Sequence, residues 1–123
     1  MKMESETLAQ ACREYADNRK AEDIVVLDVR KISSITDFFV IASGSSDPHL
    51  RAIVNEIEDS LHKDHKTKAQ RVDGDHHSGW VVMDLVDVIV HVMRKDVRDK
   101  YDLEGLWSDA PKLEPVERVI SKQ

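Results

Sequence analysis

Hydrophobic and polar residues alternate with helical spacing near the start of the chain and then give way to strand-like runs. The apolar positions of the first segment are Leu8, Ala11, Cys12, Tyr15 and Ala16. Their spacing along one helical face predicts an amphipathic helix, which the charged residues 17–23 end. Residues 24–29 (IVVLDV) are mostly β-branched and too few for a helix, so they predict a largely buried strand.

The same succession of strand and helix is expected in the middle of the chain. Residues 38–42 (FFVIA) predict a second strand, and the Ser-Gly-Ser-Ser sequence at 43–46 breaks it. Asp47 is expected to be the N-cap of the next helix, with Pro48 as its first residue. One stripe of this helix is apolar and should cover a sheet face. The stripe consists of Leu50, Ile53, Val54, Ile57 and Leu61.

The pattern of the following segment predicts further strands. After the polar residues 62–70, a short strand can form near Arg71, and residues 73–79 are predicted to be a loop. Both alternating faces of residues 80–93 are largely apolar, which is typical of central strands or of a sheet with one face open to a partner. A hairpin is expected near Leu85, although no Asn-Gly or Asp-Gly pair marks it.

A final helix completes the predicted elements, with Asp96 expected to cap it. Its apolar positions are Val97, Tyr101, Leu103, Leu106 and Trp107. The order helix, strand, strand, helix, strands, helix predicts an α/β fold with one mixed β-sheet flanked by helices. At 123 residues the chain fits a single domain spanning 1–123. Its core is expected at about 5–111, followed by a charged tail at 112–123.

The charge balance changes the expected partner. The chain has 18 Lys and Arg residues against 24 Asp and Glu residues, for a net charge of −6. It lacks the basic field that supplies most non-specific nucleic-acid affinity, so little direct RNA binding is expected. Opposite charges accelerate the encounter of protein partners, and an acidic domain is therefore suited to a basic protein.

The single cysteine and the N-terminal sequence indicate a compartment. Cys12 is the only cysteine, so no disulfide can form within the chain, and its place on the apolar helix face predicts a buried, inert thiol. The first ten residues are polar and acidic, without the apolar segment of a signal peptide. No apolar run approaches the ~20 residues that span a bilayer. A cytoplasmic protein without membrane contact is expected.

The turn around Gly44 is the one candidate for phosphate binding, because it joins a strand to a helix N-terminus. A P-loop also needs a second Gly and a Lys at fixed spacing, and neither is present. Nucleotidyltransferases need two carboxylates alternating on a strand. The nearest pair, Glu56 and Glu58, falls on the predicted helix, where the two side chains diverge. Neither a cofactor nor an enzymatic activity is therefore expected, and a nucleotide-handling enzyme that uses the Gly44 turn is the alternative.

Two groups of polar residues are candidates for a metal site and for an acid–base site. His62 and His65, together with His76 and His77 in the predicted loop, could bind a metal by spacing alone, and the sequence leaves this open without predicting a site. Asp84, Asp87 and His91 could form an acid–base group. On a regular strand, however, Asp87 and His91 share one face and Asp84 lies on the other. No nucleophile accompanies them, so no catalytic residue is predicted.

The large aromatic residues are the main indication of a binding surface. Trp80, Tyr101 and Trp107 lie among carboxylates in the last third of the chain. Tryptophan and tyrosine dominate the residues that anchor protein interfaces. An apolar centre with an acidic rim therefore favours docking of a basic protein. A homodimer that buries the same aromatic residues remains an alternative.

Several ordered motifs resemble one family over roughly residues 5–111. They are Ser33-Ser34-Ile35-Thr36-Asp37-Phe38-Phe39, Ser43-Gly44-Ser45-Ser46 with His49 and Ala52-Ile53, Gly79-Trp80, Met83-Asp84, Asp87-Val88-Ile89-Val90-His91-Val92, and Tyr101-Asp102-Leu103-Glu104 before Leu106-Trp107. In these motifs the chain resembles the ribosomal silencing factors, also called the Iojap-like family. Many motifs in one order form a specific match.

The resemblance implies both a fold and a function. The fold would be nucleotidyltransferase-like, without the catalytic carboxylates. The protein would bind the large ribosomal subunit through that subunit's fourteenth protein and obstruct association with the small subunit, and so repress translation. The partner-binding residues carried over to this sequence are Trp80, Asp84, Leu85, Tyr101, Leu103, Glu104 and Trp107.

The sequence departs from the commoner family pattern at three positions. Val86 stands where many members have glycine between two strands, which leaves the turn geometry open. Gly105 replaces a long basic residue and, within a helix, costs about 1 kcal/mol relative to alanine. Pro48 takes a position that is often basic. None of these changes an aromatic residue.

Overall fold

The computed structural model describes residues 4–115, and these form four helices and five strands. In chain order the elements are α1 (Ser5–Asn18), β1 (Glu22–Asp28), β2 (Phe38–Gly44), α2 (Asp47–His65), β3 (Arg71–Asp75), β4 (Trp80–Asp84), β5 (Val88–Arg94), α3 (Lys95–Tyr101) and α4 (Leu103–Leu106). Most of the predicted charged tail, residues 116–123, lies outside the described part of the chain.

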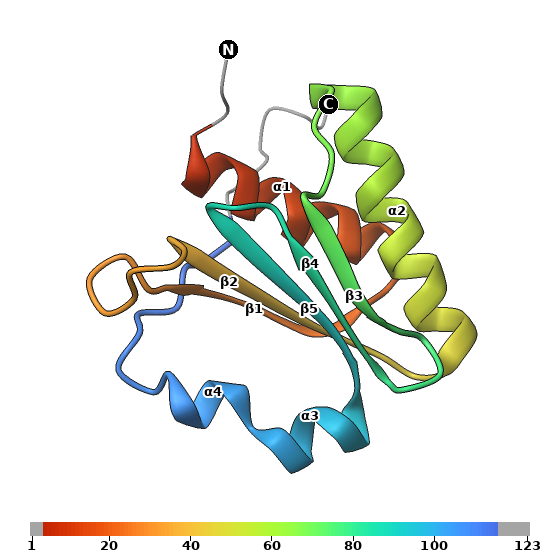
Figure 1. The fold of residues 1–123 in the computed structure, drawn as a ribbon. Helices are drawn as coiled ribbons and strands as arrows, with labels where there is room; N and C mark the ends of the chain where they lie inside the picture. Colours follow the sequence, from red (N-terminus) through yellow and green to blue (C-terminus); the bar gives the residue numbers. More distant parts are fainter. Residues whose placement is uncertain (1–3, 116–123) are drawn as a thin grey trace.

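The five strands form one mixed sheet in the order β1-β2-β5-β4-β3 (Figure 1). β2 and β5 run parallel, and the other neighbouring pairs are antiparallel. The register pairs Ile41 with His91 and His91 with Val82, so these three side chains lie on one face of the sheet. The predicted α/β fold with a single mixed sheet flanked by helices is confirmed.

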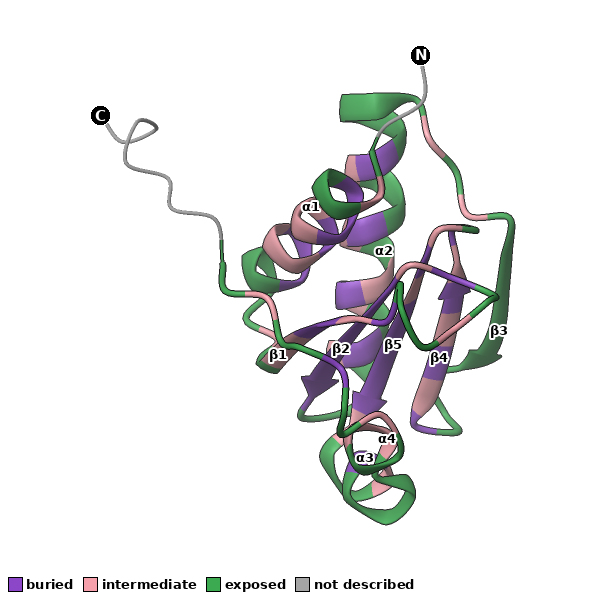
Figure 2. Ribbon diagram, turned by 90° about the vertical axis from the view of Figure 1, so that its left-hand side faces the viewer, coloured by how far each residue is buried: buried purple, intermediate pink, exposed green. Residues whose placement is uncertain are grey.

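Helices α1 and α2 cover one face of the sheet (Figure 1). The stripe predicted for α2 faces the sheet, and Leu50, Ile53, Ile57 and Leu61 are almost completely enclosed (Figure 2). Cys12 of α1 is buried in the same core, as predicted. Burial raises the pKa of the Cys12 thiol to about 12, so the group stays protonated and inert.

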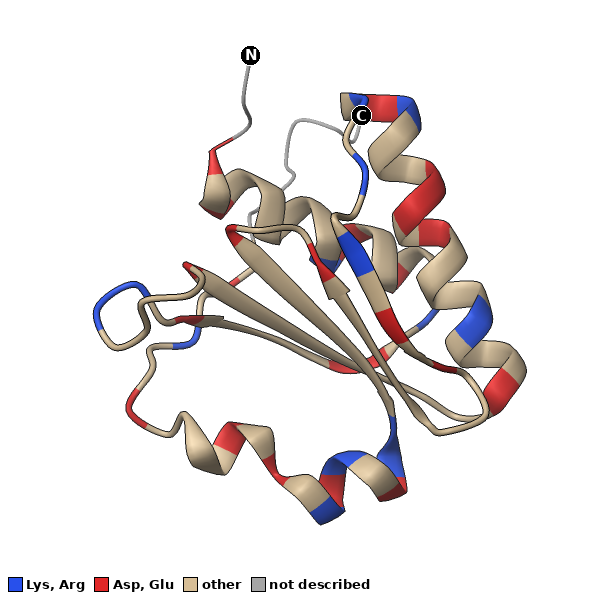
Figure 3. Cartoon of the chain, viewed as in Figure 1, with Lys and Arg blue, Asp and Glu red and all other residues tan. Residues whose placement is uncertain are grey.

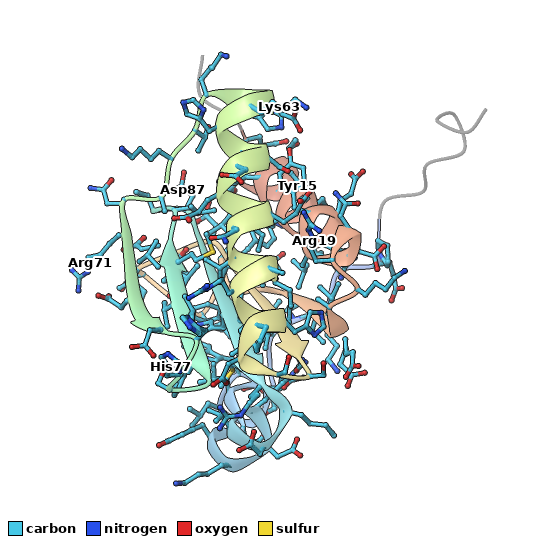
Figure 4. The ribbon with its side chains drawn as sticks, turned by 90° about the vertical axis from the view of Figure 1, so that its right-hand side faces the viewer. Tyr15, Arg19, Lys63, Arg71, His77 and Asp87 are labelled. Carbon is cyan, nitrogen blue, oxygen red and sulfur yellow. The ribbon has the colours of Figure 1, made fainter. Side chains whose placement is uncertain are left out.

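Polar contacts join the two helices at the edge of this core. Figure 4 shows Tyr15 of α1 and Arg19, the residue that follows this helix, beside α2. The Tyr15 hydroxyl donates to Asp64 at 2.9 Å, and burial, followed by this hydrogen bond, raises the pKa of Tyr15. The Arg19 guanidinium donates to Glu56 at 3.2 Å. These bonds add polar contacts to the apolar packing of α1 against α2.

The opposite face is crossed by α3 and α4, which we call the strap (residues 95–107) (Figure 1). The strap leaves the end of β5 and passes below the sheet. The chain then returns to the edge strand β1, where Asp28 donates its N–H to the Pro111 carbonyl at 2.9 Å. Leu113 donates to the Val26 carbonyl at the same distance.

The structure corrects the predicted start of α2. The N-cap is Ser46, whose hydroxyl accepts from the His49 N–H at 3.2 Å. Asp47 is the first helical residue instead and forms an ion pair with Arg94 at 3.0 Å. Serine and aspartate are equally good N-caps, so the choice between neighbours depends on backbone conformation, which the sequence pattern does not specify.

The start of the last helix was also predicted wrongly. Arg94 occupies the N-cap position of α3 without a side-chain cap, and Asp96 lies inside the helix. The Asp96 carboxylate accepts from the Arg94 guanidinium at 2.9 Å. The predicted single helix is two helices, because Asp102 takes a left-handed conformation (φ 44°) between them.

Between α2 and β5, the loop predicted at 73–79 is shorter, because β3 extends to Asp75. The predicted hairpin is confirmed. Leu85 donates its N–H to the Val88 carbonyl at 2.9 Å, and Val86 has a φ of 75°. A β-branched residue rarely adopts this left-handed conformation, which glycine adopts freely. Glycine, which the family resemblance leads us to expect at this position, would adopt this conformation without strain.

Candidate partner-binding surface

The aromatic residues from the sheet and the strap gather on the face opposite α1 and α2. Trp80 at the start of β4 packs against Tyr101 at the end of α3, with ring centroids 5.0 Å apart. Trp107 packs against Phe39 of β2 at 5.1 Å. Trp80, Leu103 and Trp107 all contact the smaller core on this side of the sheet. The structure thus brings together three of the predicted anchors with Leu103.

A buried histidine supports the central indole. The Trp80 Nε1–H donates to His91 Nδ1 at 3.1 Å. His91 is buried, and burial lowers its pKa from 6.5 to about 4. The ring is therefore neutral at pH 7 and presents an unprotonated Nδ1 to the indole.

These aromatic side chains remain partly open to solvent. Tyr101 is 49% exposed and Leu106 is 74% exposed, while Trp80, Leu103 and Trp107 are half-buried. We call these five side chains the strap surface. Sequence reasoning placed Leu106 on the helix but overlooked it as a candidate contact.

A hollow of about 620 Å³ lies beside the strap surface, between the β3–β4 hairpin and α3. Its lining includes Trp80, Val82, Val97 and Tyr101 together with the polar residues Asp73, Ser78, Arg94, Asp96 and Lys100. Lys100 Nζ lies 5.5 Å from the centre of the Tyr101 ring. Acidic and basic residues alternate on α3 (Figure 3), so the rim is of mixed charge at this end.

Two predicted contact residues lie away from the strap surface. Asp84 is at the opposite end of β4 from Trp80, and its carboxylate accepts from the Val86 N–H at 2.8 Å. Leu85 is only 7% exposed and belongs to the core under α1 and α2. The chain reverses at this point, which turns Leu85 toward the helices.

Glu104, another predicted contact, is held within the chain. Arg98 Nε donates to Glu104 Oε1 at 3.0 Å, and Arg98 Nη2 donates to Glu104 Oε2 at 2.9 Å. Arg98 Nη1 also donates to the Ser43 hydroxyl at 2.8 Å. The hydrogen bond from Arg98 lowers the pKa of Glu104. Sequence reasoning missed Arg98, because a charged residue in a charged helix gives no signal of burial.

The turn around Gly44 is filled by a side chain. The Ser45 N–H donates to His49 Nδ1 at 2.8 Å, and His49 Nε2 donates to the Arg19 carbonyl at 2.7 Å. A Cβ on Gly44 would lie 2.8 Å from Leu50 Cδ2, so glycine allows the turn to pack closely on α2. The Ser45 N–H and the Ser46 hydroxyl, which could otherwise hold a phosphate, are thus engaged with His49.

The carboxylate pair considered for metal-dependent transfer lies on α2, as predicted. Glu56 accepts from Asn18, Arg19 and Ser60. Asp73 and Asp75 do alternate on a strand, which the sequence prediction of a loop overlooked. These carboxylates are nevertheless far from the Ser-Gly turn. Asp75 pairs with Trp80, Trp80 with Met93, and Met93 with Ser43, so three strand spacings, about 14 Å, separate Asp75 from Ser43.

The histidines do not assemble into a cluster in the described part of the chain. Residues 4–115 contain no group of three or more His, Cys, Asp or Glu side chains that could hold a metal ion. The rings of His76 and His77 lie with their centroids 4.2 Å apart, and His77 lies 3.5 Å from Asp47.

The expected placement of Asp84 relative to His91 is wrong. Asp84 pairs with Ile89, and Val82 pairs with His91, so Asp84 and His91 lie on the same face. The hairpin between β4 and β5 breaks the alternation of a single regular strand. His91 is nonetheless buried and bonded to Trp80, so the two residues do not form an exposed acid–base group. No helix of residues 4–115 has the length and apolarity to cross a membrane.

The fold and the strap surface together define an α/β domain with one closed and one partly open sheet face. Comparison with known proteins identifies the family. A family model described as "Ribosomal silencing factor during starvation" matches residues 2–123. The chain belongs to the ribosomal silencing factor family.

Individual relatives agree with this assignment. The chain is 40% identical to the ribosomal silencing factor RsfS of Halalkalibacterium halodurans, covering 97% of this chain and 100% of the relative. It is 33% identical to "Mitochondrial assembly of ribosomal large subunit protein 1" of Mus musculus, covering 72% of this chain and 40% of that protein. The crystal structure of protein CV0518 from Chromobacterium violaceum has a TM-score of 0.81 at 31% identity, covering 97% and 98% of the two chains.

Proposed function

We propose that this protein represses translation by binding the large ribosomal subunit through its fourteenth protein and so blocking association with the small subunit. The observation that supports this proposal is the strap surface, where Trp80, Tyr101 and Trp107 remain partly exposed. Partly exposed aromatic residues on a protein of this family are suited to docking. The mechanism is steric exclusion and needs no catalytic group.

The size and charge of the protein fit this mode of action. A standard interface buries about 800 Å² on each partner, which a domain of 123 residues can supply on one face. The net charge of −6 favours encounter with a basic ribosomal protein and opposes approach to RNA. The relative from Mus musculus is named for assembly of the ribosomal large subunit, which points to the same partner.

The proposed contact residues divide into two groups by position. The centre consists of Trp80, Tyr101, Leu103, Leu106 and Trp107. Asp84 lies at the far end of β4 and would extend the contact along that strand. Leu85 and Glu104 are engaged within the chain and would act by supporting their neighbours.

Co-sedimentation with purified large subunits, followed by a subunit-joining assay, tests the proposal. The wild-type protein is expected to co-sediment at modest salt and to inhibit joining. A Tyr101→Ala variant should be weakened in both activities, and an Ile35→Ala variant is the matched control. Ile35 is 70% exposed but lies in the β1–β2 connection, outside the strap surface. Free sedimentation of the wild-type protein with undisturbed joining would refute the proposal.

The alternative of a nucleotide-handling enzyme is less well supported, because His49 occupies the Gly44 turn. Equilibrium dialysis against nucleoside triphosphates with magnesium separates the two functions. Binding that depends on Ser45 or Ser46 would favour the alternative. Measurement of the mass in solution, with and without large subunits, tests whether a homodimer competes for the same aromatic residues.

A further inference from the structure

Arg98 occupies a place that is unusual for a permanently charged side chain. Among residues 4–115 it is the only Lys, Arg, Asp or Glu that is buried, with a side chain only 8% exposed. Removing a charge from water costs several kcal/mol unless well-oriented partners compensate it. A helix placed only for coverage of the sheet would present an apolar residue here. The burial of Arg98 therefore indicates a role beyond coverage of the sheet.

The side-chain hydrogen bonds of Arg98 link its own helix, α3, to two other elements. Its guanidinium leaves α3 and donates two parallel hydrogen bonds to Glu104 of α4, at 3.0 and 2.9 Å. A third bond of 2.8 Å reaches the Ser43 hydroxyl at the end of β2. This paired geometry fixes both distance and direction, because the guanidinium and the carboxylate are planar.

The bonds span the only break in the strap. Asp102, in its left-handed conformation, separates α3 from α4, and these helices have only seven and four residues. Helices so short have little stability of their own and depend on tertiary contacts. Arg98 and Glu104 lie on either side of Asp102 and hold the two helices at one angle.

The angle between α3 and α4 sets the arrangement of the strap surface. Tyr101 is the last residue of α3, and Trp107 directly follows α4. Tyr101 rests on Trp80 of β4, and Trp107 rests on Phe39 of β2. A change at the Asp102 break would move these two aromatic rings relative to each other while the rest of the sheet stays in place.

We infer that Arg98 is a positioning residue for partner docking, because its bonds to Glu104 and Ser43 hold the two halves of the strap surface in one arrangement. The inference rests on the proposed function and assigns Glu104 to the same role. The acidic side chain acts on Arg98 and not directly on a basic partner. The surface is then ordered before the partner arrives, which strengthens binding without an added contact.

A double-mutant cycle on docking to large subunits tests the inference. The variants are Arg98→Met, Glu104→Gln and the combination of both, with affinity measured well below the unfolding temperature of each. Each single variant is expected to bind about tenfold more weakly, and the double variant no more weakly than either single one. Arg98→Lys keeps the charge and one hydrogen bond, and it should recover part of the affinity.

The matched control is the ion pair between Lys95 and Asp99 on the same helix. Its atoms are 3.6 Å apart, and both side chains are 67% exposed. Lys95→Met and Asp99→Asn change the charge in the same way as the test variants but leave the Asp102 break untouched. These controls should change the affinity less than about threefold.

The salt dependence of binding distinguishes positioning from direct contact. If Glu104 acts through Arg98, Glu104→Gln lowers the affinity and leaves its dependence on salt as in the wild type. A reduced salt dependence of Glu104→Gln, with unchanged affinity of Arg98→Met, would overturn the inference. Full affinity of every variant would overturn it as well. Failure of the wild-type protein to bind large subunits would instead refute the proposed function.

Discussion

The two faces of the sheet are covered in different ways. One face lies under α1 and α2, which have 14 and 19 residues, and its side chains are mostly aliphatic and fully enclosed. The other face lies under α3 and α4, which have only seven and four residues. There the contacts are aromatic, and Tyr101 is 49% exposed.

This difference assigns separate tasks to the two faces. Long helices fill one side with close-packed aliphatic residues, and burial of this kind is the main source of folding free energy. The short strap leaves apolar area uncovered on the other side. Stability should therefore depend mainly on the closed face, and docking mainly on the open one.

The largest expected effect is on the closed face. Ile53 is completely buried between α2 and the sheet. Ile53→Ala removes three methyl or methylene groups from this packing and should lower the free energy of unfolding by about 4 kcal/mol. Urea denaturation measures the loss. Ile35→Ala, at an exposed position, should change it by less than about 0.5 kcal/mol.

The docking affinity of folded Ile53→Ala is expected to stay within a factor of about three of the wild type. A large loss of affinity in the folded variant would show that the two faces are coupled, contrary to the division of tasks.

The second effect concerns acid sensitivity of the open face. Burial lowers the pKa of His91 to about 4 in the folded protein, from 6.5. Between these two pH values the unfolded chain binds a proton that the folded protein does not. The contribution of neutral His91 to the free energy of unfolding is therefore complete above pH 6.5. It falls as the pH drops toward 4, by roughly 3 kcal/mol at most.

Denaturation curves at several pH values measure this loss, and His91→Gln is the control because it removes the titrating group. The variant should depend less steeply on pH than the wild type between 6.5 and 4. Equal slopes would mean that protonation of His91 is not linked to folding.

The third effect is on docking alone. Tyr101→Ala removes an exposed ring from the strap surface and should weaken binding to large subunits by about 2 kcal/mol. Its free energy of unfolding should fall by less than about 1 kcal/mol, because half of the ring is already in water. Sedimentation and urea denaturation of one preparation provide both numbers. Unchanged affinity would remove Tyr101 from the proposed contact.

The smallest effect is expected at the hairpin between β4 and β5. Val86 has a φ of 75°, which is strained for a β-branched side chain. Val86→Gly should raise the free energy of unfolding by about 1 kcal/mol, after the greater freedom of glycine in the unfolded chain is subtracted. Thermal unfolding measures the change. A loss of stability would mean that the exposed valine makes compensating contacts.

The sequence predicts the closed face better than the open one. Leu50, Ile53, Ile57 and Leu61 follow the helical period, and all of them are buried against the sheet. β3 was only partly predicted, because all of its residues are exposed and none marks a buried face. Backbone pairing with β4, and not hydrophobic alternation, defines this strand.

Prediction of the site depended on residue type more than on geometry. The chemistry of tryptophan and tyrosine favours a contact surface, and the structure gathers Trp80, Tyr101 and Trp107 on the strap side. Binding of a partner by these residues stays a prediction. The sequence analysis did not single out Arg98, and it expected Leu85 at the contact although Leu85 is buried, because burial of a charged residue and reversal at a hairpin are decided by tertiary contacts. A periodic pattern along one element carries no information about either.

The return of the chain to β1 has a consequence for the strength of binding. One end of the strap continues directly from the central strand β5, and the chain beyond its far end is tied to the edge strand β1 by the bonds of Asp28 and Leu113. A segment anchored at both ends samples few conformations in the free protein. It therefore loses little conformational entropy when a partner covers it. Most of the free energy of the contacts with the partner then contributes to slow dissociation of the complex.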